Sequence, residues 1–112
     1  AQQQLVEKRL EMTKSWLFSG QASTITLQIK SIENGDQLKA ELQRISQLLE
    51  IDNVYLYRKN QNGITYTVIL YGNFDERKEA LAALNNLPVE IKNNRPYLRT
   101  LGGINKDIEQ AQ

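Results

Sequence analysis

Tyrosine, glutamine, threonine and basic side chains recur at every second position in three stretches of this sequence that favour β-strands. Since alternate residues of a strand point to the same side of a sheet, we expect these side chains to share one face. The first strand contributes Thr24, Thr26, Gln28 and Lys30, the second Tyr55, Tyr57 and Lys59, and the last Tyr97, Arg99 and Leu101. Such a set suits a carbohydrate, because aromatic rings stack on the apolar faces of sugars while amides and hydroxyls provide hydrogen-bond partners.

Two other interpretations of this face stay open. Aromatic residues on a four-stranded sheet can stack the bases of single-stranded nucleic acid. The net charge of +1 and the lack of the aromatic RNA-binding signature count against nucleic acid as a partner. The tyrosines can also be ordinary strand residues, or the N-terminal helix can cover the face.

Catalysis is not expected from this composition. The chain has no histidine and no cysteine, which removes the commonest general base, the commonest metal ligand and every thiolate site. A Ser-His-Asp arrangement therefore cannot form. Carboxylates stand at turns and helix starts, where capping accounts for them: Asp36, Asp52, Asp75 and Glu76. We predict a protein that is not an enzyme and that uses no metal or cofactor.

The 112 residues are enough for one compact domain, and 40% hydrophobic with 24% charged residues is an ordinary globular balance. No apolar run approaches the roughly 20 residues that span a bilayer, and we expect no signal peptide within these residues. We therefore expect no membrane insertion by this chain itself; any membrane anchor of the parent protein would lie outside it.

The stretch from Gly63 to Phe74 is predicted to be the central strand. Both alternating sets of positions are largely apolar or amphipathic, as in a strand with neighbours on both sides. Asn62-Gly63 before it favours a type I′ hairpin turn. The other predicted elements are a strand at Thr24–Ser31, a helix with the stripe Leu38, Leu42, Ile45 and Leu49, a strand at Val54–Lys59, a helix capped by Asp75 with the stripe Ala80, Leu81, Leu84 and Leu87, and a strand at Pro96–Leu101.

This order of elements, β-α-β-β-α-β, predicts an α+β fold of the ferredoxin-like type. Four antiparallel strands form the sheet, the first and third strands are central, and the two helices cover one face. We expect Gly102-Gly103 to end the last strand and the polar tail from residue 104 to form no more than a ragged helical turn. The second face of the sheet is therefore expected to have no helix over it.

A helix is also predicted at Gln2–Phe18, ended by Gly20. Its stripe is imperfect because Arg9 and Thr13 interrupt it. We expect residues 1–20 to be an appended helix whose Trp16 end packs on a domain formed by residues 21–112. A coiled-coil or membrane-surface role is less favoured, since the apolar stripe covers only two or three turns.

The segment YTVILYGNFDERKEALAALNNLP, followed by RPYLR, resembles the C-terminal half of SPOR domains, the sporulation-related repeat of bacterial cell-envelope proteins. The likeness is strongest to the branch that ends DamX-like cell-division proteins, whose first strand is similar to TITLQIKS at Thr24–Ser31. It extends from about Thr24 to Ile108. Tyr-Gly-x-Phe followed by Ala-x-x-Ala-Leu-x-x-Leu-Pro is moderately specific.

This resemblance implies the βαββαβ fold and binding to peptidoglycan, with preference for glycan strands stripped of their peptide stems. Such strands occur at the division septum, so the resemblance implies a septal targeting module in the periplasm, tethered to the inner membrane by a segment outside this chain. Carried over by position, the groove residues are Gln28, Ser31, Tyr66 and Tyr97; strand alternation adds Tyr57 and Arg99. The branch usually has tryptophan at the positions of Tyr66 and Tyr97, which implies a smaller stacking area here.

The expected partners are thus peptidoglycan glycan strands, with divisome proteins as further candidates and the protein itself a monomer. A rival hypothesis is a protein–protein interaction module of a pilus or secretion assembly, where ferredoxin-like domains pair through sheet edges or helices. That hypothesis predicts self-association or capture of a protein partner without sugar binding.

Overall fold

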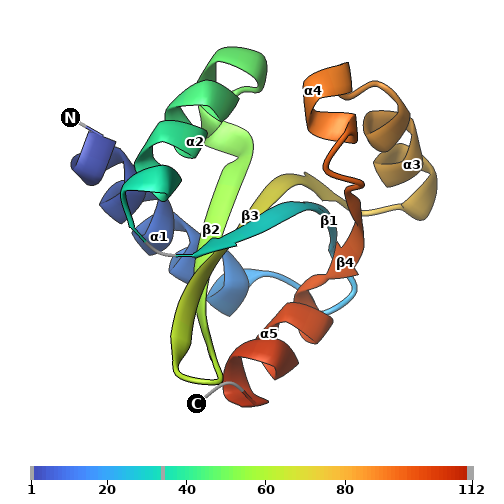
Figure 1. The fold of residues 1–112 in the computed structure, drawn as a ribbon. Coiled ribbons are helices and arrows are strands. Elements are labelled where there is room, and N and C mark those ends of the chain that lie inside the picture. Colours follow the sequence, from blue (N-terminus) through green and yellow to red (C-terminus); the bar gives the residue numbers. More distant parts are fainter. Residues whose placement is uncertain (1, 34, 111–112) are drawn as a thin grey trace.

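A four-stranded antiparallel sheet with strand order β2-β3-β1-β4 forms the centre of the molecule (Figure 1). The computed structural model describes residues 2–33 and 35–110. The strands are β1 (Ile25–Glu33), β2 (Val54–Gln61), β3 (Ile64–Phe74) and β4 (Tyr97–Thr100); the helices are α1 (Gln2–Ser19), α2 (Asp36–Leu48), α3 (Arg77–Asn85), α4 (Val89–Lys92) and α5 (Leu101–Gln110), with a 3-10 turn η1 at Ile51–Asn53. The α+β class and the central position of the first and third strands are confirmed.

One side of the sheet, which we call the helical face, packs against α2, α3 and α4. The buried side chains include Leu27, Ile29, Val54, Leu56 and Ile69 from the strands, Leu38, Leu42, Ile45, Ala80 and Ile91 from these helices, and Val6 from α1 (Gln2–Ser19). Burial of this apolar surface is the main favourable contribution to folding. Three of the four residues in the predicted stripe of α2 are therefore correct, whereas Leu49 lies just beyond the helix as its C-cap, in an extended conformation.

The turn between β2 and β3 has the predicted geometry. Asn62 and Gly63 have φ angles of 55° and 81°, both in the left-handed region that a type I′ turn requires. Every residue from Val54 to Gln61 is paired with one of β3, so this turn sets the register of the longest hairpin in the sheet.

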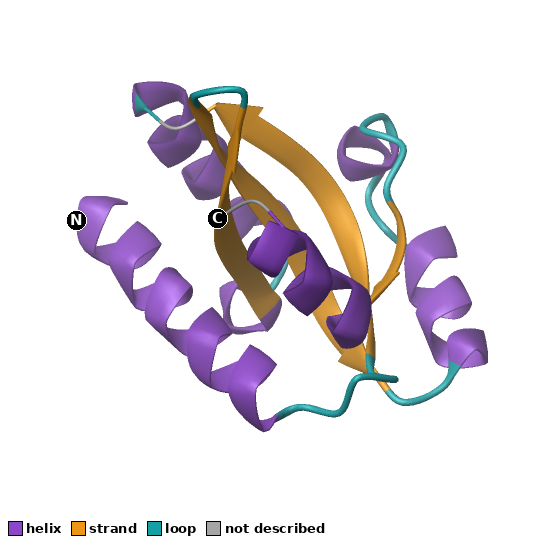
Figure 2. Cartoon of the chain, turned by 90° about the horizontal axis from the view of Figure 1, so that it is seen from below, coloured by secondary structure: helices purple, strands orange, loops and turns teal. Residues whose placement is uncertain are grey.

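The opposite side, which we call the α5 face, is not bare, contrary to the sequence-based expectation. The chain continues from β4 directly into α5, a ten-residue helix that lies in front of the sheet in Figure 2. The Thr100 hydroxyl caps this helix by accepting a hydrogen bond from the Gly103 N–H at 3.1 Å. Leu101 and Ile104 are fully buried against Val68 and Leu70.

The Gly102-Gly103 pair begins this helix rather than only ending a strand. The N–H of Gly102 donates to the carbonyl of Ala22, and a Cβ on Gly102 would lie 3.2 Å from that residue. Glycine therefore allows the start of α5 to approach the segment that leads into β1.

Helix α1 lies along the outer edge of β2. Arg9 and Thr13, the two polar interruptions in its stripe, are buried there. The Arg9 guanidinium donates to the carbonyl of Ile51 at 2.6 Å, and the Thr13 hydroxyl accepts the N–H of Leu56 at 2.7 Å. Thr13 thus satisfies a backbone N–H that the edge strand β2 would otherwise expose, and Arg9 satisfies a carbonyl of the turn η1 that precedes β2.

An aromatic stacking contact attaches the C-terminal end of α1 to the sheet. The rings of Trp16 and Tyr55 lie 3.8 Å apart at 12°, so the Trp16 end packs on the sheet as expected. Met12, on another side of this helix, is 49% exposed.

Two predicted helix details are wrong. The N-cap of α3 is Glu76 rather than Asp75, and it makes no side-chain capping bond. Leu81 of the expected α3 stripe is 39% exposed. The connection after Pro88 also contains a short helix, α4, which buries Ile91. Within residues 2–33 and 35–110, no helix is long and apolar enough to cross a membrane.

Candidate functional site

All six sequence-predicted site residues lie on the α5 face. Directly paired residues of antiparallel strands share a face. Gln28 pairs with Leu70 on one side and with Tyr97 on the other, and Arg99 pairs with Thr26. Val68 pairs with both Ser31 and Tyr57. Tyr66, Val68 and Leu70 are alternate residues of β3, so they share this face. The structure therefore brings all six positions to one surface.

A bulge in β1 makes this possible. The register shifts between Gln28 and Lys30, so that Ile29 and Lys30 both turn to the helical face. Lys30 lies 3.8 Å from Glu41 of α2, which corrects its predicted place beside Gln28. Strict alternation would put Gln28 and Ser31 on opposite faces, whereas the extra residue places both on the α5 face.

A chain of hydrogen bonds joins three of the six residues to α5. The same Nη1 of Arg99 donates to Oε1 of Gln28 and to the hydroxyl of Tyr57, each at 2.8 Å. That hydroxyl donates to a carboxylate oxygen of Asp107 at 2.8 Å. Lys59 and Arg99 lie 2.9 and 3.6 Å from the same carboxylate.

This polar cluster, defined as Gln28, Tyr57, Lys59, Arg99 and Asp107, shifts the pKa of two members. Burial raises the pKa of the Tyr57 hydroxyl, and its hydrogen bond to Asp107 raises it further. Burial opposes ionisation of Asp107, but hydrogen bonds from Lys59 and Tyr57 and the charges of Lys59 and Arg99 outweigh it and lower its pKa. Tyr57 therefore stays protonated and Asp107 stays charged at neutral pH.

Exposure divides the six positions into two groups. Tyr97 is 53% exposed, Ser31 is exposed, and Gln28 and Tyr66 are half-buried. The second group is Tyr57 and Arg99: Tyr57 is only 4% exposed and packs with Leu17 and Ile108, and the Arg99 side chain is 17% exposed. The expectation that Tyr57 faces solvent is wrong, because α5 and the end of α1 cover its ring.

We call the four accessible residues, Tyr97, Gln28, Ser31 and Tyr66, the open strip. It crosses the sheet from β4 over β1 to β3. Thr24, Thr26 and Leu101, also predicted for an open face, are buried. The open strip thus offers two aromatic side chains with an amide and a hydroxyl between them.

Asp107 is a residue of this surface that the sequence did not predict, and the exposed Glu33, which pairs with Tyr66, is another. The signal for Asp107 was present: Leu101, Ile104 and Ile108 follow Thr100 at helical spacing and define an amphipathic helix with a cap. The glycine pair outweighed that signal in the prediction.

The described part of the chain holds no group of three or more acidic, histidine or cysteine side chains that could bind a metal ion. Its polar surface residues can donate and accept hydrogen bonds and stack on a planar or apolar ring. This arrangement is suited to recognition of a ligand.

Comparison with known proteins gives two results. Residues 21–100 match the sequence model of the SPOR domain family. A curated relative, cell division protein DamX of Serratia marcescens, is 25% identical over 92 residues. That alignment covers 82% of this chain and 41% of the relative, so the chain spans less than half the length of that protein.

Proposed function

Because the chain belongs to the SPOR domain family, we propose that it is a non-catalytic module that binds the glycan strands of peptidoglycan and directs its parent protein to the division septum. Its preferred ligand would be glycan from which the peptide stems have been removed. The start of the family match at residue 21 supports the proposal that residues 1–20 are an appended helix on a domain formed by residues 21–112.

The observation that carries this proposal is the open strip. Tyr97 lies on the edge strand β4 and Tyr66 lies on β3. Gln28 and Ser31 lie on β1, the strand between β3 and β4. A glycan strand presents alternating apolar ring faces and polar acetamido and hydroxyl groups. The two tyrosines would stack on sugar rings, while Gln28 and Ser31 would hydrogen-bond the groups between them.

Arg99 would act by positioning Gln28. A guanidinium can only donate hydrogen bonds, so it fixes Oε1 of Gln28 toward itself and directs the NH₂ group away. That NH₂ group would donate to an acetamido carbonyl of the sugar. Arg99 shares the carboxylate of Asp107 with Lys59, so these three side chains keep a net charge of +1, and that charge would add a longer-range attraction for a lactyl carboxylate.

Tyr57 would also act on the open strip indirectly, by positioning Arg99. Its ring has no free side for a sugar, and its hydroxyl holds Arg99 in place. We thus propose direct ligand contact for Gln28, Ser31, Tyr66 and Tyr97, and a positioning role for Tyr57 and Arg99.

The expected place of action is the periplasm at the division site, with a tether to the inner membrane outside this chain. The relative's name, a cell division protein, supports this proposal. Divisome proteins are then further candidate partners, and the module would act as a monomer.

Co-sedimentation with purified peptidoglycan sacculi, intact and amidase-treated, tests the proposal. We expect more protein to pellet with treated sacculi. Tyr97→Ala should weaken binding by about 1 kcal/mol, roughly fivefold, through loss of one stacked ring. Tyr97 is 53% exposed, so the variant should fold normally.

Phe18→Ala is the matched control, because Phe18 is a 93% exposed aromatic residue on α1, away from the open strip. It should bind as the unaltered protein does. A folded Tyr97→Ala protein that pellets as strongly as the control would refute the site, and absence of pelleting with either kind of sacculus would refute glycan binding.

A further inference from the structure

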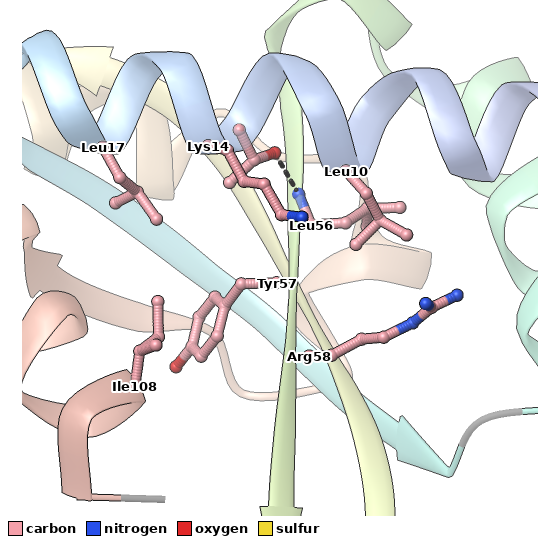
Figure 3. A pocket seen from close by; sticks show the side chains of 8 residues that line it. Leu10, Lys14, Leu17, Leu56, Tyr57, Arg58 and Ile108 are labelled. Atoms are coloured by element: carbon pink, nitrogen blue, oxygen red, sulfur yellow. Dashed lines mark hydrogen bonds between the residues drawn. The ribbon is translucent and has the colours of Figure 1, made fainter. Parts of the chain in front are cut away.

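A groove of about 270 Å³ lies between α1, β2 and α5 (Figure 3). Its lining is mostly apolar and comes from all three elements: Leu10, Leu17, Leu56, Tyr57 and Ile108, with the stem of Thr13. Helices α1 and α5 both lie outside residues 21–100, which match the family. This surface therefore depends on parts of the chain that the family match does not include.

Two cationic side chains flank the groove. Lys14 extends from α1 toward β2, and Arg58 leaves β2 on the side opposite to Tyr57 (Figure 3). Both are exposed, and neither forms an ion pair with another residue in the parts of the chain that the structure describes. Asp107, on the same helix as Ile108, is already paired with Lys59 and Arg99. The groove thus combines an apolar floor with a rim that carries Lys14 and Arg58, and Arg58 also lines a neighbouring hollow with Glu7 and Asp36.

The edge of β2 adds a third feature. The N–H of Leu56 points away from β3 and is taken by the Thr13 hydroxyl. Since backbone groups alternate in direction along a strand, the N–H and carbonyl of Arg58 also point outward. An extended peptide can pair with backbone groups at such an edge and place alternate side chains into a neighbouring pocket.

We propose that this groove binds a short extended segment of a partner protein in which apolar and acidic residues alternate. The apolar side chain fills the groove, the acidic side chains pair with Lys14 and Arg58, and the peptide backbone hydrogen-bonds with Arg58. This site is separate from the open strip and does not depend on glycan binding.

The size of the groove favours a peptide side chain over a whole small molecule. Pockets that bury drug-sized ligands usually have volumes of about 300–1,000 Å³ and enclose most of the ligand. The groove is smaller and open along β2, which suits one or two anchoring side chains. Lys14 and Arg58 on its rim add selectivity for an acidic segment.

The test is a titration followed by amide chemical shifts of isotope-labelled protein. The probe is a blocked hexapeptide in which leucine and glutamate alternate; a second peptide has glutamine in place of glutamate, and a third has serine in place of leucine. We expect shifts confined to residues around Lys14, Arg58 and Ile108 with the first peptide only, weakening as salt increases.

Charge-reversal variants complete the test. The double variant Lys14→Glu, Arg58→Glu changes exposed residues and should weaken binding of the first peptide by about tenfold or more. The control Lys8→Glu, Arg77→Glu makes the same change in net charge at exposed positions outside the groove and should bind normally. Both double variants should bind sacculi as the unaltered protein does, which separates this proposal from the glycan proposal.

Three outcomes would overturn the proposal. One is equal binding of the glutamine peptide, and another is absence of shifts at the groove with every peptide. The third is concentration-dependent sedimentation that Lys14→Glu, Arg58→Glu abolishes, because a second copy of the chain would then be the occupant.

Discussion

The two faces of the sheet are both covered, but by different kinds of contact. On the helical face, α2, α3 and α4 bury aliphatic side chains such as Leu42 and Ile45, and the Lys30–Glu41 ion pair lies at the margin of this core. On the α5 face, one ten-residue helix combines the apolar contacts of Leu101 and Ile104 with the polar cluster around Asp107.

This difference indicates that the two faces differ in stability. Apolar burial is non-directional and grows with area, so the helical face should resist changes of pH and salt. An isolated helix of ten residues is marginal in water and depends on its tertiary contacts. We infer that α5 is a separately opening unit, whereas the helical face unfolds only with the whole domain.

The largest expected effect is that of Leu42→Ala on the helical face. Leu42 is 1% exposed, and removal of its side chain leaves a cavity that α2 and the sheet cannot fill. The free energy of unfolding should fall by about 3 to 5 kcal/mol. Urea denaturation followed by circular dichroism measures this; a loss below about 1 kcal/mol would contradict the assignment of this face as the main core.

The next largest effect is expected for Ile104→Ala on α5. Ile104 is fully buried, but the loss cannot exceed the free energy with which α5 docks, because the sheet and α2 remain folded when α5 opens. We expect about 1 to 2 kcal/mol. Amide hydrogen exchange should accelerate in α5 while the amides of α2 stay protected. Equal acceleration in both helices would show that the two faces unfold together.

The sequence predicted the helical face well because its signal is repeated spacing of aliphatic residues. Leu38, Leu42 and Ile45 define α2, and the apolar character of β3 on both alternating sets correctly made it central. Helix α5 was missed because glycine disfavours helix interiors by about 1 kcal/mol relative to alanine. Contacts with Ala22 and β3 outweigh that cost, and such contacts are not visible in local sequence.

The candidate site was predictable in part. The resemblance supplied Gln28, Ser31, Tyr66 and Tyr97, and the structure places these four on one face. Alternation alone would have separated Gln28 from Ser31, because the bulge at Ile29 has no distinctive residue type. Alternation did select Tyr57 and Arg99 for the correct face, but it gave no sign of the helix that covers them.

The smallest expected effect concerns the charge that holds α5. The pKa of Asp107 is lowered in the folded protein, so its ionised form favours the docked helix. This contribution is fully present above the ordinary aspartate pKa of about 4 and is lost as the pH falls through the lower folded value. Asp107→Asn keeps the shape of the side chain and should cost about 1 kcal/mol at pH 7.

The difference in unfolding free energy between Asp107→Asn and the unaltered protein, measured by urea denaturation from pH 7 to pH 2, checks this. It should shrink toward zero at acid pH, because both proteins are then uncharged at this position. Glu109→Gln, which removes an exposed carboxylate from the same helix, controls for the change in net charge. If the Asp107→Asn difference stays constant across this range, the charge of the carboxylate does not stabilise the docked position of α5. Helix α5 would then be docked by apolar contacts alone, those of Leu101 and Ile104, just as α2 is docked by its own apolar residues on the helical face.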